Sequence, residues 1–285
     1  MSDQPEISFI LVSWNVRELL ISCLSSLEQY VQQPHEVIVV DNASTDGTVD
    51  RLRTTFPRVR VVANAKNLGF ARGNNQGWQL ARGQFVVLLN ADTQLLNDPF
   101  PLLTNYLRQH LSAACVAPEL LYPDHRHQQS VRRFPRLLDQ VQVLLKLRSW
   151  STPAMKSYLA DPGVGQREPL PVEQVMGAAM VMPRWALQEI GLFDERFPNW
   201  FEEVDWCYRA KQAGYAVVYH PGARIMHHGG QSFGQILSLK KHVWLLTGLN
   251  RYAEKHWSRT AQWVIRVLTP ISYGLTAVQT LIKPR

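Results

Sequence analysis

The chain has 285 residues, of which 46% are hydrophobic, so it can form one large α/β domain or two small ones around a sizeable core. Its three cysteines, Cys23, Cys115 and Cys207, form no close pair, which argues against a disulfide framework or a zinc site and favours reducing conditions. The net charge of +7 favours an anionic partner, and a nucleotide, a nucleic acid or a lipid surface would each fit it. Because the first ten residues lack the basic start and apolar stretch of a secretory signal, we expect a cytoplasmic protein.

Apolar runs alternate with helical patterns in the first third of the chain. The runs are ISFILV at 7–12, VIVV at 37–40, VRVV at 59–62 and FVVLL at 85–89. The helices between them are expected after Leu20, near 45–55 and near 70–81. Because the runs are apolar nearly throughout and do not alternate with polar residues, the pattern predicts a parallel sheet that is buried on both faces. Ligands bind such sheets at the carboxyl ends of the strands.

Polar residues follow every one of these predicted strands. Asp92, directly after the fourth strand, suits a hard divalent cation, although an isolated loop aspartate also caps helices and turns. Asp41 can accept hydrogen bonds from a base or ribose, whereas the residues at 44–46 fit helix capping. Arg72 either faces a phosphate or lies on an exposed helix face. The glycines of 67–77 do not match GxGxxG and no P-loop is present, which argues against a dinucleotide oxidoreductase and a P-loop nucleoside triphosphatase.

The pattern weakens between 120 and 171, where we expect a mobile connection around one helix near 137–148. Order returns with a strand over 174–182, a helix that begins at Pro183 and stops at Gly191, a helix that ends at Gly214 and a strand over 215–219.

Two polar clusters lie in this second half. The segment EEVD at 202–205 crowds three carboxylates beside aromatic residues, which raises a carboxylate pKa and suits a general base. An acidic first turn that complements a helix dipole explains the same residues equally well. His227 and His228 follow a strand, and a histidine pair of this kind is a ligand only where a metal is already suspected.

Residues 235–285 differ in character from the rest. Basic residues alternate there with Trp244, Trp257 and Trp263, and the segment 267–282 carries no charge. Because this segment is shorter than a spanning helix and contains a proline, we expect an amphipathic helical tail that lies in the membrane interface.

Taken in order, the motifs of the chain resemble those of the inverting GT-A glycosyltransferases of family 2, and most of all the bacterial rhamnosyltransferase-type branch. The matching stretches are VSWN at 12–15, EVIVVDNASTDGT at 36–48, NLGFARGNNQG at 67–77, LLNADT at 88–93, GAAMVMPRWALQEIGLFDERF at 177–197, FEEVDWCYRAKQAGY at 201–215 and HHGGQSF at 227–233. The resemblance covers residues 7–233. It implies a GT-A domain over 1–234, with a nucleotide-binding half at about 1–118, an acceptor half at about 172–234 and the helical tail at 235–285. The implied fold is a Rossmann-like, mainly parallel sheet flanked by helices.

The resemblance also implies roles for individual residues. Glu203 stands at the position of the catalytic base, with Glu202 as its competitor and Asp205 as a supporting acid. Asp92 stands at the last acid of the DxD motif and, with His227 or in reserve His228, should bind Mn²⁺ or Mg²⁺ beside the donor diphosphate. The substrate-binding residues implied are Ser13, Asn15, Asp41, Gly69, Arg72, Asn90, Gly177 and Trp200. We expect Phe201 and Trp206 to join Trp200 in stacking on the acceptor sugar.

The implied reaction moves a sugar, with rhamnose from dTDP-rhamnose as the first candidate, to a saccharide or lipid-linked acceptor of cell-surface polysaccharide. The expected location is the inner face of the plasma membrane. A non-catalytic nucleotide- or sugar-binding protein on the same sheet is the alternative. A nucleic-acid binder has only the net charge in its favour, because the chain shows no recognition motif.

Overall fold

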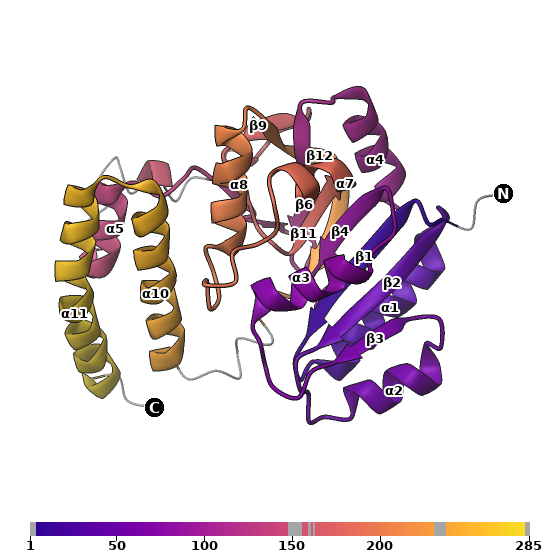
Figure 1. The fold of residues 1–285 in the computed structure, drawn as a ribbon, viewed down its shortest axis with the longest axis horizontal. Helices are drawn as coiled ribbons and strands as arrows, with labels where there is room; N and C mark the ends of the chain where they lie inside the picture. Colours follow the sequence, from indigo (N-terminus) through magenta and orange to yellow (C-terminus); the bar gives the residue numbers. More distant parts are fainter. Residues whose placement is uncertain (1–3, 148–155, 159–160, 162, 231–237, 283–285) are drawn as a thin grey trace.

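The computed structural model describes residues 4–147, 156–158, 161, 163–230 and 238–282. A central sheet is covered by helices on both faces, and a group of helices stands beside it at the C-terminal end (Figure 1). The strands and short strand segments are β1 (Ile7–Ser13), β2 (His35–Asp41), β3 (Arg60–Ala63), β4 (Phe85–Leu89), β5 (Thr93–Leu95), β6 (Ala113–Leu121), β7 (His127–Gln128), β8 (Val131–Arg132), β9 (Leu170–Val172), β10 (Gln174–Val175), β11 (Ala179–Pro183) and β12 (Ala216–His227). The helices are α1 (Arg17–Tyr30), α2 (Thr48–Thr55), α3 (Phe70–Leu80), α4 (Phe100–Gln109), α5 (Leu137–Leu144), α7 (Arg184–Glu189), α8 (Glu202–Gln212), α10 (Ser238–His256) and α11 (Arg259–Ile282).

The first four predicted strands form the parallel half of the sheet, in the order β3-β2-β1-β4. The apolar runs of β1, β2 and β4 are largely buried because α1 covers one face and α3 the other, and this packing gives two hydrophobic clusters, one on each side of the sheet. The run of β3 is only partly buried, because β3 is an edge strand and carries the exposed Arg60. The predicted fold class is confirmed. The parallel strands end together, so the residues after β1 and β4 meet at one edge.

The sheet continues beyond β4 as β11, β6, β12 and β5, and this half is mixed. β11 runs antiparallel to β4, whereas β12 runs parallel to β6 and places its end, His227, beside Thr93 of β5. The predicted strand over 174–182 is two strands, β10 and β11, because the chain leaves extended pairing at 176–178.

β6 was not predicted from the sequence. Pro118 lies within it, and a proline in an apolar run argues against a strand because proline lacks the N–H group of the ladder. The structure accommodates it with an irregularity, since the pairing jumps from His220 opposite Pro118 to Arg224 opposite Glu119.

The C-terminal helices α10 and α11 pack against each other, and α11 also packs against α5 (Figure 1). No helix in the described ranges is both long enough and apolar enough to cross a membrane. The predicted boundary between domain and tail at 234/235, and the QSF end of the histidine motif, lie outside the described residues.

Candidate active site

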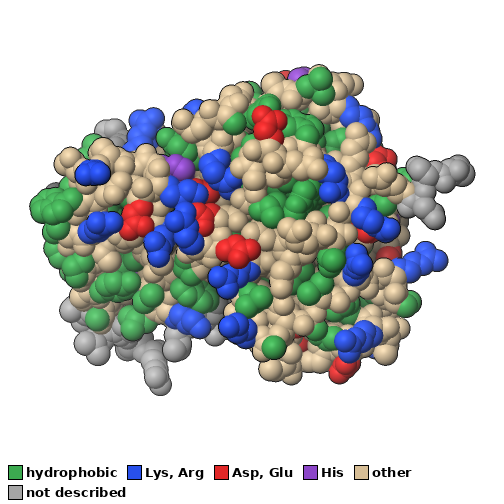
Figure 2. All heavy atoms as spheres, viewed as in Figure 1, with side chains coloured by type: hydrophobic (Ala, Val, Ile, Leu, Met, Phe, Trp, Pro, Cys, Tyr) green, Lys and Arg blue, Asp and Glu red, His purple; other side chains and the backbone are tan. Residues whose placement is uncertain are grey.

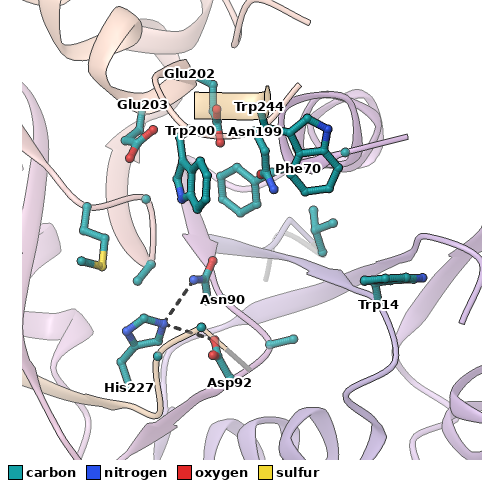
Figure 3. Close-up of a pocket in the computed structure, with 18 of the residues that line it drawn as sticks. Trp14, Phe70, Asn90, Asp92, Asn199, Trp200, Glu202, Glu203, His227 and Trp244 are labelled. Carbon is teal, nitrogen blue, oxygen red and sulfur yellow. Dashed lines mark hydrogen bonds and ion pairs between the residues drawn. The ribbon is translucent and has the colours of Figure 1, made fainter. Parts of the chain in front are cut away.

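A cavity of about 770 Å³ opens at the carboxyl ends of β1 and β4. The loops after these strands supply one wall, the start of α8 a second, the β7–β10 region a third, and α10 closes part of the rim. The lining includes Ser13, Trp14, Asn42, Gly69, Phe70, Asn90, Asp92, Gln128, Gln129, Ser130, Arg132, Gln174, Met176, Gly177, Asn199, Trp200, Glu202, Glu203, His227, Lys240 and Trp244. Figure 3 shows Asn90, Asp92 and His227 facing Glu202 and Glu203 across the cavity.

Asp92 and His227 form the polar centre of the first wall. Asp92 lies in the turn between β4 and β5, and His227 is the last residue of β12, so the mixed half of the sheet brings them together. Both side chains are buried, and His227 Nε2 lies 3.2 Å from Asp92 Oδ1 and 3.3 Å from Asn90 Nδ2. Because a strand follows Asp92, the residue does not cap a helix. His228 lies outside the cavity lining, and its backbone N–H donates to the carbonyl oxygen of Asp92.

The ring of His227 is oriented from behind by Gln128. His227 Nδ1 lies 2.8 Å from Gln128 Oε1, and because an amide oxygen only accepts, Nδ1 carries a proton. The other ring nitrogen, Nε2, faces Asp92 Oδ1, and either a proton on Nε2 or a cation bound between the two atoms satisfies this contact.

These donors fit a divalent cation, since one carboxylate and one imidazole are suitable ligands and Gln128 orients the imidazole in the way usual for metal-bound histidines. Among the described residues, no group of three or more His, Cys, Asp or Glu side chains gathers at one point. The protein therefore supplies few ligands, and phosphate oxygens and water would complete the set.

Glu202 and Glu203 begin α8 on the opposite wall. Each has one buried oxygen, Oε2, that lacks a hydrogen-bond partner among the described residues. Burial raises the pKa of Glu202 well above its ordinary value, and the nearby charge of Glu203 raises it further. Burial also raises the pKa of Glu203, against the opposing effects of backbone N–H groups and of Arg132. Glu203 is the more exposed of the two, so it is better placed to take a proton from a ligand.

A strained turn positions these two glutamates. Trp200 and Phe201, which directly precede α8, have φ values of 64° and 72°, in the left-handed region that non-glycine residues avoid. The α10 helix packs closely on this turn, since a Cβ atom on Gly248 would lie 2.9 Å from Phe201 Cδ2 and 3.1 Å from the carbonyl oxygen of Trp200. Trp200 lines the cavity beside Phe70 (Figure 3).

Asp205 lies two residues beyond Glu203 but does not line the cavity. It is fully buried, with Arg209 Nε 2.9 Å from its Oδ2 and Lys255 Nζ and His256 Nε2 2.6 and 2.8 Å from its Oδ1. Burial alone would raise the pKa of Asp205, but these three partners outweigh it and lower the pKa. The structure thus places Asp205 in an ionic contact between α8 and α10.

The residues predicted to contact the nucleotide are divided between the cavity and its surroundings. Ser13 lines the cavity, as does Asn42, which was not predicted; Asp41 is buried next to it, accepts a hydrogen bond from the backbone N–H of Ser44, and has Oδ1 without a partner among the described residues. Asn15, with a φ of 51°, joins two loops, since its Oδ1 accepts from the backbone N–H of Thr45. Ser44 accepts from the backbone N–H of Asn15, so it joins the loops instead of capping α2.

Of the other residues predicted to bind substrate, some line the cavity and some do not. Gly69 lines the cavity with a φ of 86°, and a Cβ atom there would lie 2.9 Å from the carbonyl oxygen of Pro198. Gly177 lines the cavity beside Phe70. Arg72 lies outside the lining, half exposed, in an ion pair with Glu195 at 3.3 Å. Trp206 is fully buried and donates to the carbonyl oxygen of Gly191, so the prediction that it stacks on an acceptor was wrong.

Two parts of the lining were not predicted. The β7–β10 region supplies Gln128, Gln129, Ser130 and Arg132 from a segment that we expected to be a mobile connection. The strands β7 and β8 in this segment have only two residues each, too few for an alternating pattern to be recognised. The tail supplies Lys240 and Trp244, whose ammonium group and ring lie 5.1 Å apart. The alternation of basic and aromatic residues in the tail was visible in the sequence, but it suggested a membrane surface.

Comparison with known proteins places this site in context. The family model for Glycosyl transferase family 2 matches residues 8–156, more than half of the chain. The chain is 28% identical over 227 residues to an N-acetylglucosaminyl-diphospho-decaprenol L-rhamnosyltransferase of Mycobacterium tuberculosis, an alignment that covers 74% of this chain and 72% of the relative.

Solved structures share the fold. GalNAc-T7 with UDP, GalNAc and Mn²⁺ superposes with a TM-score of 0.59 at 17% identity, over 80% of this chain and 44% of that one. The mannosyltransferase PcManGT of Pyrobaculum calidifontis, in complex with GDP-Man and Mn²⁺, superposes with a TM-score of 0.56 at 17% identity, over 99% of this chain and 77% of that one. At this identity the structural likeness establishes the fold alone.

Proposed function

Since the chain belongs to glycosyl transferase family 2, we propose that it moves a sugar from a nucleotide-sugar donor to a lipid-linked saccharide, with inversion at the anomeric carbon. The first candidate for the donor is dTDP-rhamnose. The acceptor proposed is a sugar on a lipid diphosphate, and both proposals take support from the rhamnosyltransferase relative. The observation that carries the proposal is the placement of Asp92 and His227 opposite Glu202 and Glu203 in one cavity.

In the proposed reaction the acceptor hydroxyl lies against Glu203. The hydroxyl oxygen attacks the anomeric carbon while Glu203 takes its proton, and the bond between that carbon and the diphosphate oxygen breaks with its electron pair on the diphosphate. Asp92 and His227 would hold a Mn²⁺ or Mg²⁺ ion, which neutralises the charge that develops on the leaving diphosphate. Trp200 and Phe70 form the apolar side of the sugar site.

The unpaired glutamates count against the alternative of a non-catalytic binding protein. Buried carboxyl oxygens without partners cost stability, and glutamines or apolar residues at 202 and 203 would relieve that cost. A protein that only bound nucleotides would have no need of glutamates at 202 and 203.

A thermal-shift experiment tests the donor side. Nucleotide sugars should raise the melting temperature of the purified protein with Mn²⁺ present, because a ligand of the folded state stabilises it. We expect the largest shift with dTDP-rhamnose, and its loss on chelation or in Asp92→Ala. If neither nucleotide sugars nor nucleoside diphosphates produce a metal-dependent shift, the proposed function is wrong.

We also propose that α11 docks the enzyme on an anionic membrane, where a lipid-linked acceptor would be found. Trp263, Val267, Ile271 and Leu275 recur every four residues on α11 and are 64%, 44%, 46% and 37% exposed. Residues 238–282 carry six Lys or Arg side chains and a single acid, Glu254, which complements an anionic surface. Figure 2 shows hydrophobic and basic side chains together at this end of the molecule.

The membrane proposal is tested with point variants, because deleting the tail would also remove Lys240 and Trp244 from the cavity rim. Trp263→Ser combined with Ile271→Ser should abolish cosedimentation with vesicles that contain anionic lipid. Leu111→Ser is the matched control, because Leu111 is 75% exposed on a loop at the end of α4. Equal vesicle binding by both variants would contradict docking through α11. The location of the protein at the inner face of the plasma membrane stays a prediction.

A further inference from the structure

The β7–β10 wall of the cavity has a cationic group that the donor chemistry leaves unused. Arg132 is partly buried, and its Nη2 donates to Gln129 Oε1 at 3.1 Å. Among the described residues, no carboxylate lies within ion-pair distance of it, although its neighbour Arg133 is held by Asp139. Arg132 is therefore a cavity arginine whose charge has no ionic partner in the described part of the protein.

A second group on the same wall also lacks a partner. Ser130 is 8% exposed and lines the cavity, and its Oγ has no hydrogen-bond partner within the described ranges. Ser130 precedes Arg132 by two residues, and neighbours at this spacing in an extended chain share a side. The pairing of Arg132 with Gln174 of β10 adds one more polar lining residue to this wall.

The position of this wall relates it to the acceptor. Arg132 lies close enough to Glu203 for its charge to lower the pKa of that carboxyl group. Arg132 therefore lies near Glu203, the group proposed to take the proton from the acceptor. Asp92 and His227, which would serve the donor diphosphate, lie across the cavity from Glu203 (Figure 3).

An arginine beside a catalytic base would by itself weaken the base. The arrangement is useful if a bound anion neutralises the arginine, because the pKa of Glu203 then returns to the higher value that its burial sets. A guanidinium and a hydroxyl donor together suit phosphate oxygens, which accept several hydrogen bonds at once.

We propose that Arg132 and Ser130 bind a phosphate group of the acceptor, so that the enzyme selects a sugar carried on a lipid diphosphate over a neutral glycoside. This inference rests on the proposed function and assigns its acceptor specificity to the β7–β10 wall. Arg132 and Ser130 are binding residues in this proposal, and Glu203 remains the base.

The test compares three acceptor probes with the intact protein: N-acetylglucosaminyl-diphospho-octyl, octyl N-acetylglucosaminide and octyl glucuronide. Dissociation constants are measured by calorimetry with dTDP and Mn²⁺ present, so that the donor site is filled and no turnover occurs. Charge-assisted hydrogen bonds are each expected to change affinity by about 10- to 100-fold. The diphosphate probe should therefore bind about 10- to 100-fold more tightly than the neutral glycoside.

Arg132→Gln should remove most of that preference and leave the affinity for the neutral glycoside within about twofold. Ser130→Ala should remove a smaller part of it. Arg126→Gln is the matched control, because Arg126 lies on the same segment but is exposed and paired with Asp124 outside the cavity. Unchanged dTDP binding in all variants shows that the donor site is intact.

Three results would overturn the inference. They are equal binding of the diphosphate and neutral probes by the wild type, an equal loss for both probes in Arg132→Gln, and a larger preference for the glucuronide, which would assign Arg132 to a sugar carboxylate. Failure of the wild type to bind dTDP with Mn²⁺ is a separate result, because it contradicts the proposed function itself.

Discussion

The polar cluster around Asp92 and His227 differs from the glutamates that face it across the cavity in how fully its hydrogen-bonding groups are satisfied. Gln128, from the β7–β10 region, forms a continuous chain of contacts of 2.8 to 3.3 Å with His227, Asp92 and Asn90. Elsewhere in the lining, Ser13, Ser130, Glu202 and Glu203 each keep a buried oxygen without a partner in the described structure.

The two sets of residues therefore differ in how they are prepared to bind a ligand. The cluster around Asp92 is arranged in advance, which is what the proposed metal site requires if its two protein ligands are to act together. The two glutamates of α8 each have a buried oxygen without a partner in the described structure, which suits the proposed role of Glu203 as a base that is not already neutralised. Substitutions in the two sets of residues should therefore differ in what they change.

The largest effect is expected for Glu203→Gln. Glutamine keeps the size of the side chain but cannot accept a proton, so kcat should fall by about 10²- to 10⁴-fold while nucleotide affinity changes little. Transfer from dTDP-rhamnose measured beside dTDP binding checks this. A variant with at least half of the wild-type kcat would show that Glu203 is not the base, and Glu202→Gln tests the competitor.

Asp205→Ala should have a different outcome, although Asp205 lies on the same turn of α8. Removing one partner of a buried ionic cluster leaves Lys255, His256 and Arg209 without their common acceptor and should cost about 3–5 kcal/mol of unfolding free energy. Denaturant unfolding measures that loss. Where the variant is folded, its affinity for dTDP and Mn²⁺ should stay near that of the wild type, and a selective loss of kcat without loss of stability would return Asp205 to the catalytic machinery.

Gln128→Ala should lower the affinity of Asp92 and His227 for a metal ion without changing either residue. Without the acceptor at Nδ1, the ring of His227 loses its orientation, and loss of such an outer contact lowers metal affinity by about 10- to 100-fold. Manganese titration in the presence of dTDP measures this, with Gln129→Ala as the neighbouring control. The proposed role of Gln128 in orienting His227 is contradicted if both variants bind Mn²⁺ equally well.

The smallest effect is a pH-dependent gain of stability in Glu202→Gln. Because the pKa of Glu202 is raised above 4.5 in the folded protein, the folded state binds more protons than the unfolded state above that pH. Wild-type stability should therefore fall as the pH rises from about 4.5 through the raised pKa, and the glutamine variant should not share this fall. The difference in melting temperature between variant and wild type should grow from pH 4.5 to pH 8, by about 2–4 °C for each kcal/mol. A constant difference would count against a raised pKa.

The sequence was most informative where a long apolar run ends in a polar group. The runs at 7–12 and 85–89 predict buried parallel strands, and Asp92 directly after such a run predicts a group at the ligand-binding edge. The resemblance to family 2 is confirmed by the family match. His227 could be connected with Asp92 through that resemblance, but not through spacing, because 135 residues separate them and only the pairing of β12 with β5 brings them together.

The sequence was least informative where side chains act through short elements. Arg132 and Ser130 belong to a strand pair too short to produce a pattern, and Pro118 obscured β6. Glu203 and Asp205 could not be distinguished from the sequence. Glu203 lines the cavity, whereas Asp205, two residues later, points toward α10, which begins more than 30 residues further along the chain.

The close contact between Gly248 and the turn at Trp200 and Phe201 has a consequence for protein engineering. The family match ends at residue 156, and both the turn that starts α8 and Gly248, which braces it, lie beyond that point. Exchanging the C-terminal tail for that of a relative would therefore also alter the geometry of Glu202 and Glu203. A chimera should keep its own α10 together with its catalytic domain and exchange only the outward face of α11.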